Sequence, residues 1–226
     1  MDVVAQDFQV TTLVVFNGDV DREFLVSQLL VSGLVVAADG AVRAILEAGG
    51  SCDVLVGDMD SLNQSDLTEL RVVNPELDVR MFPSEKDATD GELALRVALE
   101  SDPDRIVVVG AFGGNRLDHE LANISLLANE ALRDRDVVLV DPTRRVSLLT
   151  NQTEINGDPG DVITLIPFGG GATGISSEGL RYELNNRDLF FGASLGVSNE
   201  LLATSAVVTV VTGMVLVIHE GQGSTD

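Results

Sequence analysis

The chain has 226 residues, of which 45% are hydrophobic, and its formal net charge at pH 7 is −22. This length and apolar content suffice for one large or two small globular domains with a hydrophobic core, and they argue against a long disordered span. The strongly acidic balance argues against nucleic acid as a partner, because the phosphate backbone would be repelled, and an anionic small substrate would need a metal ion or locally gathered arginines.

The first two thirds of the chain alternate short apolar runs with longer mixed segments. Continuous Val, Leu and Ile runs are typical of strands covered on both faces, as in a parallel sheet. The predicted strands are 13–16, 34–38, 54–56, 79–82, 106–109 and 137–140. Helix-like segments lie between them at 21–32, 41–48, 65–72 and 91–100, and a further apolar stripe runs through Leu121, Ile124, Ala128 and Ala131. This alternation predicts a doubly wound α/β domain with a mostly parallel sheet.

The pattern changes after about residue 146, where no convincing long helix follows. Short strand-like runs at 161–168, 180–184, 206–211 and 214–219 are separated by Gly-rich or Asn-rich turns. They predict a small all-β domain, so that domain 1 spans 1–146 and domain 2 spans 147–226. We interpret FGGGATG at 168–174 as a flexible connection rather than a phosphate loop, because no helix pattern follows it.

Cysteine content, the opening residues and one late apolar stretch bear on the cellular compartment of the protein. A single cysteine, Cys52, excludes an intrachain disulfide. The opening MDVVAQDFQV lacks the features of a signal peptide. The apolar stretch 207–218 is too short to span a bilayer and reads as two strands meeting at Gly213. We therefore expect a soluble, cytoplasmic protein with no membrane partner.

Several polar residues fall at the carboxyl ends of the predicted strands. Asp39 closes LVVAAD, Asp58 and Asp60 close VLVGDMD, and Asp141 closes DVVLVD. In open α/β sheets the ligand crevice lies at this edge. Carboxylates gathered there would oppose one another's ionisation unless a divalent cation joined them, and Mg²⁺ prefers such oxygen ligands. The alternative is that Asp58 caps the next turn while Asp60 is solvated; for the pair together with Asp39 we favour a metal.

A second acidic cluster is SEKDATDGE at 84–92. Thr89, followed three residues later by a glutamate, satisfies the capping-box pattern, so part of the segment starts a helix. Lys86 is the only lysine of the chain and stands directly before Asp87 and near Asp90. Acids at a helix N-terminus are ordinary, and the segment by itself leaves a structural role and a shared metal site equally open.

The third cluster is VVGAFGGNRLDHELAN at 108–123, a glycine turn after a strand. Such turns allow close backbone approach to a ligand but are a weak signal for phosphate binding. Arg116 can grip phosphate oxygens in bidentate fashion, Asp118 stands beside it, and His119 can exchange a proton near neutral pH. We interpret the other histidine, His219, as structural.

Together these segments resemble the thiamine pyrophosphokinase family, in the family's order and from about residue 35 onward. The matching pieces are ADGA at 38–41, VGDMDSL at 56–62, EKDATDGELAL at 85–95, GGNRLDHELANI at 113–124, GLRYELNN at 179–186 and GASLGVSNE at 192–200. The resemblance implies an α/β domain followed by a β-sandwich domain. It also implies Mg²⁺-dependent transfer of pyrophosphate from ATP to thiamine, giving thiamine diphosphate and AMP, in a homodimer with active sites at the subunit interface.

The resemblance also implies roles for individual residues. The metal ligands would be Asp58, Asp60 and Asp90. The catalytic set would add Asp87, Arg116 and Asp118. Residues binding the nucleotide or thiamine would be Asp39, Lys86, Thr89, Arg116 and His119 on the ATP side and Ser198 and Asn199 on the thiamine side.

Three features depart from the family pattern. Ala41 stands where the family often has a second glycine, and Asn115 is an extra residue between the glycines and the arginine. The chain has no tryptophan, so an aromatic face for thiamine would have to come from Tyr182, Phe190 or Phe191.

Two other functions share the acidic site. One is another Mg²⁺-dependent pyrophosphokinase or a phosphohydrolase, and the other is a non-catalytic sensor of nucleotide or thiamine. A sensor has no need of converging carboxylates, which disfavours it. Release of AMP only in the presence of a particular alcohol would separate transfer from hydrolysis.

Overall fold

The computed structural model describes residues 10–60, 62, 64–85, 87–133 and 135–221. Contacts divide the chain into two compact units, one of residues up to 123 with 135–137 and one of 124–134 with the chain from 138 onward. We name them the α/β unit and the β unit. The observed classes confirm the predicted combination of a mostly parallel α/β sheet followed by antiparallel β structure.

The α/β unit contains a parallel sheet in the order β4-β3-β2-β1-β5. Its strands are β1 (Thr11–Val15), β2 (Leu34–Ala38), β3 (Val54–Gly57), β4 (Asp78–Met81) and β5 (Arg105–Val109). In β1, β2 and β5 every residue after the first is buried, and β3 is buried throughout. Burial on both faces is the reason that these strands have continuous apolar runs rather than alternation.

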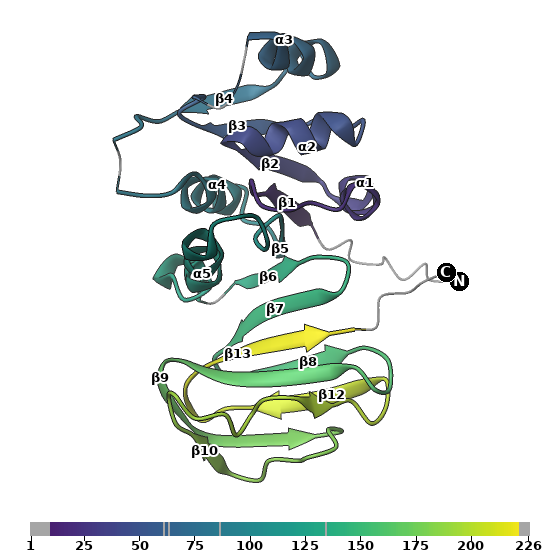
Figure 1. Ribbon diagram of the computed structural model, residues 1–226, viewed down its shortest axis with the longest axis vertical. Helices are drawn as coiled ribbons and strands as arrows, with labels where there is room; N and C mark the ends of the chain where they lie inside the picture. Colours follow the sequence, from purple (N-terminus) through teal and green to yellow (C-terminus); the bar gives the residue numbers. More distant parts are fainter. Residues whose placement is uncertain (1–9, 61, 63, 86, 134, 222–226) are drawn as a thin grey trace, which may run out of the picture. The chain divides into compact units, whose positions relative to one another are not determined.

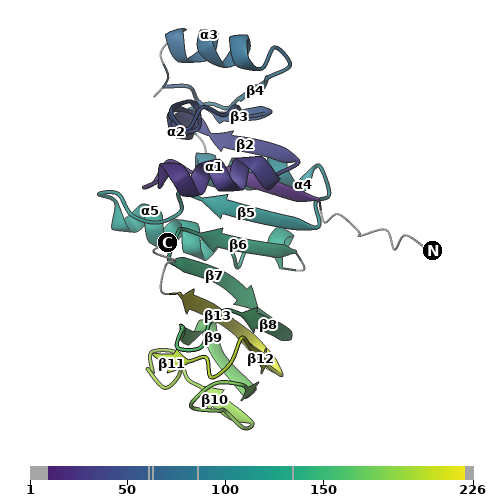
Figure 2. The ribbon, with the colours of Figure 1, turned by 90° about the vertical axis from the view of Figure 1, so that its right-hand side faces the viewer.

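Helices cover both faces of this sheet (Figures 1 and 2). Helices α1 (Arg22–Val31) and α2 (Val42–Glu47) contact each other on one face, and α4 (Asp90–Leu99) packs against β1, β2 and β3 on the other. Helix α3 (Gln64–Val73) lies between β3 and β4 in the chain, and α5 (Leu117–Leu126) follows β5. Short 3₁₀ turns occupy Asp39–Ala41 and Glu130–Leu132.

The predicted N-terminal cap of α4 is confirmed. The side chain of Thr89 accepts a hydrogen bond from the Glu92 N–H at 3.2 Å, which satisfies one of the amide groups left over at a helix start. Asp21 caps α1 in the same way through the Phe24 N–H at 2.8 Å.

The β unit is antiparallel, with neighbouring strands in the order β6-β7-β13-β9-β12-β8. The strands are β6 (Asp136–Val140), β7 (Arg144–Leu149), β8 (Gln152–Asn156), β9 (Val162–Glu178), β10 (Arg187–Leu189), β11 (Asn199–Glu200), β12 (Ser205–Thr209) and β13 (Thr212–Glu220). Their inward side chains, including Ile163, Leu165 and Ile175, form one buried core.

The Gly-rich segment 168–174 is not a connection, so that prediction was wrong. It lies inside the long strand β9, whose first part pairs with β13 and whose last part pairs with β12. The pairing with β13 shifts register between Thr212 and Met214, opposite this segment. Glycines permit the bulge and bend that let one strand serve two sheets.

The predicted strand at 180–184 was also wrong. Only an isolated bridge from Leu180 to Leu201 is present there. Side chains take over the hydrogen bonds that a strand partner would make: Asn199 binds the main chain of Tyr182, and the Ser177 hydroxyl accepts from the Leu184 N–H.

His219 has the structural role that we predicted. Its Nε2 lies 2.7 Å from Oδ2 of Asp161, and both side chains are nearly buried. The same carboxylate oxygen accepts the N–H of Asp158, so the pair ties β13 to the turn before β9.

Within the described part of the chain, no helix combines the length and apolarity needed to cross a membrane.

Candidate functional site

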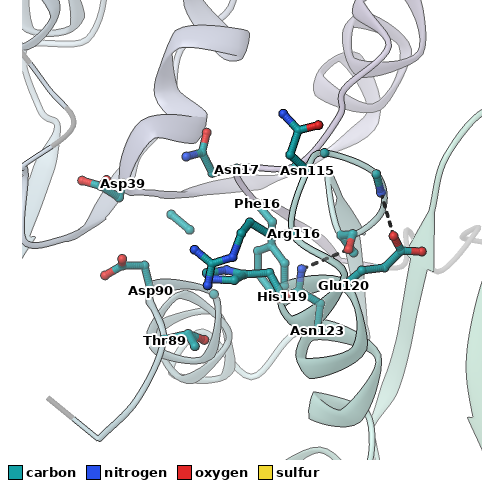
Figure 3. A pocket seen from close by; sticks show the side chains of 16 residues that line it. Phe16, Asn17, Asp39, Thr89, Asp90, Asn115, Arg116, His119, Glu120 and Asn123 are labelled. Atoms are coloured by element: carbon teal, nitrogen blue, oxygen red, sulfur yellow. Dashed lines mark hydrogen bonds between the residues drawn. The ribbon is translucent and has the colours of Figure 1, made fainter.

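A pocket of about 370 Å³ opens at the carboxyl edge of the parallel sheet (Figure 3). Residues at or just after the ends of β1, β2 and β5 form part of its wall, and the N-terminal parts of α4 and α5 form the rest. Strand β1 lies between β2 and β5, so chain connections diverge on either side of it. Crevices at such switch points are the usual ligand sites of open α/β sheets.

Two carboxylates, Asp39 and Asp90, line one side of this pocket (Figure 3). Asp39 directly follows β2, and Asp90 is the first residue of α4. The end of β3 packs tightly on Asp39, because a Cβ atom added to Gly57 would lie 2.8 Å from the Asp39 Cβ. Glycine at this position therefore permits the close approach that brings Asp58, the next residue, to the same edge.

Asp58 and Asp60 do not line the pocket itself. Oδ1 of Asp58 accepts the N–H of Asp60 at 3.1 Å, across Met59 in the left-handed region at φ 66°. The turn-capping role that we considered for Asp58 is thus present, and Asp60 is exposed. A carboxylate has about four lone-pair sites, and this bond uses one of them.

Among the residues that the structure describes, no three His, Cys, Asp or Glu side chains gather closely enough to form a metal cluster. Mg²⁺ usually keeps several waters and takes one or two carboxylates plus substrate phosphates, so a preformed three-carboxylate cage is not required. The oxygen donors at this edge have the right chemistry for Mg²⁺. The ligand set Asp58, Asp60 and Asp90 remains a prediction.

Nitrogen-bearing side chains enter the pocket opposite Asp39 and Asp90, from the start of α5. Arg116 and His119 both line it and reach toward its centre (Figure 3). The guanidinium of Arg116 also donates to both oxygens of Asp118, from Nε to Oδ1 at 2.9 Å and from Nη2 to Oδ2 at 2.6 Å. These bonds lower the pKa of Asp118 to about 2 and raise the pKa of Arg116. Asp118 is exposed and outside the pocket lining.

The glycine turn 110–114 is held in place by α5. The side-chain amide of Asn123 donates to the carbonyl of Ala111 at 3.0 Å, and the Gly113 N–H donates to Oε2 of Glu120 at 3.3 Å (Figure 3). Glu120 and Asn123 follow Arg116 by about one and about two helical turns. The turn that was predicted to approach a ligand closely is therefore fixed by the same helix that carries the arginine.

Sequence reasoning missed several pocket residues, among them Asn17, Glu120, Asn123 and Phe16. A signal was present for Asn17, which directly follows the first predicted strand just as Asp39 follows the second. Glu120 and Asn123 lie four and seven residues after Arg116, a spacing that puts all three on one helix face. Asn115, noted as a departure from the family pattern, also lines the pocket.

The remaining predicted ATP-side residues have different positions. Thr89 lines the pocket while capping α4. Asp87 is exposed and does not line it. Lys86 lies outside the described residues.

A second cavity, a groove of about 550 Å³, lies in the β unit. Its wall includes Tyr182, Leu195 and Val197, which are 65%, 53% and 49% exposed. Arg187 supplies a positive charge at the same groove. Exposed apolar side chains around a concave surface are typical of a binding site for a partly apolar ligand.

The two predicted thiamine-side residues differ in their surroundings. Asn199 lines the groove but is only 8% exposed, and its side chain is bonded to the main chain of Tyr182 and Glu200. Ser198 is exposed at φ 60° and does not line the groove. The candidate aromatics Phe190 and Phe191 are exposed outside the lining as well.

Comparisons with known proteins match both units. Residues 27–139 match the model of the thiamin pyrophosphokinase catalytic domain, and residues 151–215 match that of the thiamin pyrophosphokinase vitamin B1 binding domain. The thiamine pyrophosphokinase of Bacillus subtilis is 31% identical over 188 residues, which cover 82% of this chain and 86% of the relative.

Solved structures show the same likeness. The crystal structure of thiamine pyrophosphokinase from Bacillus subtilis superposes with a TM-score of 0.83 at 28% identity, covering 94% of this chain and 99% of that one. The enzyme from Geobacillus thermodenitrificans gives a TM-score of 0.79 at 30% identity, over 95% and 99% of the two chains.

Proposed function

The chain belongs to the thiamine pyrophosphokinase family, and we propose that it transfers a pyrophosphoryl group from ATP to the hydroxyethyl oxygen of thiamine. The products are thiamine diphosphate and AMP. The observation that carries this proposal is the pocket at the carboxyl edge, where Asp39 and Asp90 oppose Arg116 and His119. A site that contains both negatively and positively charged side chains suits a polyphosphate that binds together with a cation.

ATP occupies the pocket of the α/β unit in this proposal. Arg116 binds phosphate oxygens through the guanidinium edge that Asp118 leaves uncovered, because a guanidinium has five N–H donors and the pair uses two of them. The glycine turn 110–114 and Asn17 line the remaining wall. Lys86, Thr89 and His119 are proposed as further nucleotide contacts.

Mg²⁺ is proposed as the cofactor, held by Asp58, Asp60 and Asp90 with Asp39 nearby. When bound, it supplies charge neutralisation on the ATP phosphates. The net charge of −22 makes this need acute, since an anionic nucleotide would otherwise be repelled. Asp90 contributes from the start of α4 and Asp58 from the end of β3, so the two loops would be drawn together around one ligand.

The chain's own residues position the reactants. The thiamine oxygen attacks the β-phosphorus, the bond from that phosphorus to the α–β bridging oxygen breaks, and AMP leaves with the bridging oxygen. Phosphoryl transfers of this kind depend on alignment and charge stabilisation, and alignment alone can contribute up to about 7–11 kcal/mol. Arg116 would stabilise charge on the phosphate oxygens as it develops.

A proton must also leave the thiamine hydroxyl. Asp118 is a weak proton acceptor while Arg116 lowers its pKa to about 2. Asp87, exposed just before α4, is therefore the better candidate, and we propose it for this role.

Thiamine binds in the groove of the β unit in this proposal. Tyr182 is the one candidate aromatic among the described residues that lines the groove, so we propose its ring as the face that stacks on thiamine. The match of residues 151–215 to a vitamin B1 binding domain supports this choice.

We further propose that the domains divide into 1–146 and 147–226 and that the active enzyme is a homodimer with active sites at the subunit interface. The exposed apolar side chains of the β unit support a partner surface. Because ATP is an intracellular substrate, we propose a cytoplasmic location.

The test of the reaction is ³¹P NMR of the full chain with ATP, Mg²⁺ and thiamine, and a control without thiamine. We expect AMP and thiamine diphosphate to appear together and only in the complete mixture. Phosphate or pyrophosphate released in the control would instead identify a hydrolase. An unchanged spectrum with tight thiamine binding would identify a sensor.

A mixing experiment tests the shared site. Subunits with Asp90→Asn and subunits with Tyr182→Ala are co-expressed, and thiamine dependence is measured. If residues of both subunits form each site, some mixed dimers contain one intact site, and a low-KM component appears that neither parent shows. If each site lies within one subunit, the mixture behaves as the average of the two parents, and the interface proposal is wrong.

A further inference from the structure

In the groove of the β unit, the ring of Tyr182 is exposed while its main chain is held by hydrogen bonds. Tyr182 is 65% exposed, yet both of its main-chain polar groups are bonded to one side chain. Its N–H donates to Oδ1 of Asn199 at 3.0 Å, and its carbonyl accepts from Nδ2 of Asn199 at 2.8 Å. A single amide therefore replaces the strand neighbour that Tyr182 lacks.

Asn199 has little hydrogen-bonding capacity left for a ligand. Its Oδ1 also accepts the N–H of Glu200 at 2.9 Å, so both acceptor positions and one of two donor hydrogens are used. The residue is 8% exposed and pairs with Ile163 where β11 meets β9. A buried amide with three protein partners is typical of a structural clamp.

The loop before Asn199 is itself fixed on β9. The Leu165 N–H donates to the Gly196 carbonyl at 2.8 Å, and a Cβ atom on Gly196 would overlap the Leu165 carbonyl oxygen. The Ser198 N–H donates to the Thr164 hydroxyl at 3.0 Å. These contacts hold Asn199 in register, so its amide has one position from which to bind Tyr182.

We propose that Asn199 is a positioning residue for thiamine, which holds the main chain of Tyr182 so that the phenol ring is a preformed face of the groove. This inference rests on the proposed thiamine site and differs from the direct Asn199–thiamine contact that the family resemblance implied. A ring on a fixed main chain loses less conformational freedom when a ligand stacks on it, which favours binding.

Steady-state kinetics measure the first consequence. We expect Asn199→Ala to raise the KM for thiamine about tenfold, the effect of losing roughly one or two net hydrogen bonds. The KM for ATP and kcat at saturating thiamine should change less than about twofold, because neither Asn199 nor Tyr182 lines the proposed ATP pocket. Asn156→Ala, at an exposed asparagine of β8 away from the groove, is the matched control and should behave as wild type.

A double-mutant cycle separates positioning from contact. If Asn199 acts only through the ring, Asn199→Ala should have no further effect on the thiamine KM in a Tyr182→Ala background. A direct contact would give the same fold-change in both backgrounds, and that additivity would overturn the proposal. A thiamine KM unchanged by Tyr182→Ala would overturn it too.

Tyrosine fluorescence tests the clamp without any activity. Tyr182 is the only tyrosine of the chain and there is no tryptophan, so the emission comes from this ring alone. We expect Asn199→Ala to lower its anisotropy in the absence of ligand while Asn156→Ala leaves it unchanged. Equal anisotropy in Asn199→Ala and wild type would contradict the clamp.

The two proposals can fail separately. If no thiamine diphosphate forms, the proposed reaction is wrong, and the anisotropy still decides whether Asn199 holds Tyr182. If Asn199→Ala does not fold, Asn199→Asp serves instead: it keeps the two accepted bonds and places an oxygen against the Tyr182 carbonyl. Like Asn199→Ala, this variant should lower the anisotropy and raise the thiamine KM. Wild-type values for both would overturn the clamp.

Discussion

The pocket of the α/β unit is bounded mainly by polar and charged side chains on loops that follow strands. The groove of the β unit also has charged residues, Glu183 and Arg187, but adds an aromatic ring and exposed apolar side chains on a hydrogen-bonded main chain. Asp39, Asp90 and Glu120 give the pocket more negative than positive charge, with Arg116 opposite. Ligand binding there depends on charge and a cation. Binding in the groove depends on shape and a rigid aromatic face.

The largest expected effect comes from removing a carboxylate of the proposed Mg²⁺ site in the α/β unit. Asp90→Asn or Asp58→Asn keeps the side-chain shape but removes a proposed Mg²⁺ ligand, so kcat should fall on the order of a thousandfold. Thermal unfolding should stay close to wild type: the Asp90 charge at a helix start contributes only about 0.3–1 kcal/mol, and Asp58→Asn keeps an oxygen that can accept the Asp60 N–H. Glu69→Gln, at an exposed acid of α3, is the control. Near-native turnover of either variant at saturating Mg²⁺ would exclude it as an essential metal ligand.

The next effect tests the rigidity of the groove. Gly196→Ala places a methyl group against the carbonyl oxygen of Leu165, and we expect a loss of about 1–3 kcal/mol in the free energy of unfolding. Gly171→Ala is matched to it, because its Cβ would lie 3.5 Å from the Leu189 carbonyl oxygen, an ordinary contact. Denaturant unfolding of both variants makes the measurement. Equal stabilities would mean that the loop on β9 can shift without cost.

Hydrogen exchange sharpens the division between the two regions. ATP with Mg²⁺ should slow exchange about tenfold or more in 110–119, and thiamine should do so in 180–200, because each ligand binds only the native form of its own site. Omitting Mg²⁺ should remove most of the ATP effect and leave the thiamine effect unchanged. Protection of 180–200 by ATP alone would show that residues of the groove also contribute to ATP binding.

The smallest effect concerns the exposed pair of Arg116 and Asp118. Arg116 lowers the pKa of Asp118 from its ordinary value near 3.8 to about 2, so Arg116→Gln should raise that pKa toward the ordinary value. Because the folded pKa is depressed, the pair's stabilising effect is complete above pH 3.8 and is lost as the pH falls through about 2. Exposure to solvent keeps the effect on unfolding small. NMR titration of the side-chain carboxyl gives the pKa, and Arg71→Gln should leave it unchanged.

Local sequence was most informative for the α/β unit. Continuous apolar runs identified β1, β2, β3 and β5 to within about two residues at each end, since strands buried on both faces leave an unbroken apolar signal. The parallel direction of these strands could also be predicted, because a helix between two strands returns the chain to the same edge of the sheet. Asp39 and the turn after β5 could therefore be assigned to one crevice from the sequence alone.

Local sequence was less informative for the β unit. The alternation at 180–184 indicated a strand, and the glycines at 168–174 indicated a connection, but pairing partners distant in the sequence decided otherwise. Glycine permits both a loop and a bulged strand, so only the neighbours of β9 determine which forms.

The sequence by itself thus determined the fold class, the acidic edge of the sheet and the Thr89 cap of α4, because each leaves a signal in short stretches of the chain. Tertiary structure decided that Asn17 and Glu120 join the pocket and that Asn199 binds the main chain of Tyr182. Asn199 and Tyr182 are 17 positions apart, and Asn17 and Glu120 are farther apart still. No local periodicity encodes such contacts, since they exist only once the elements have packed.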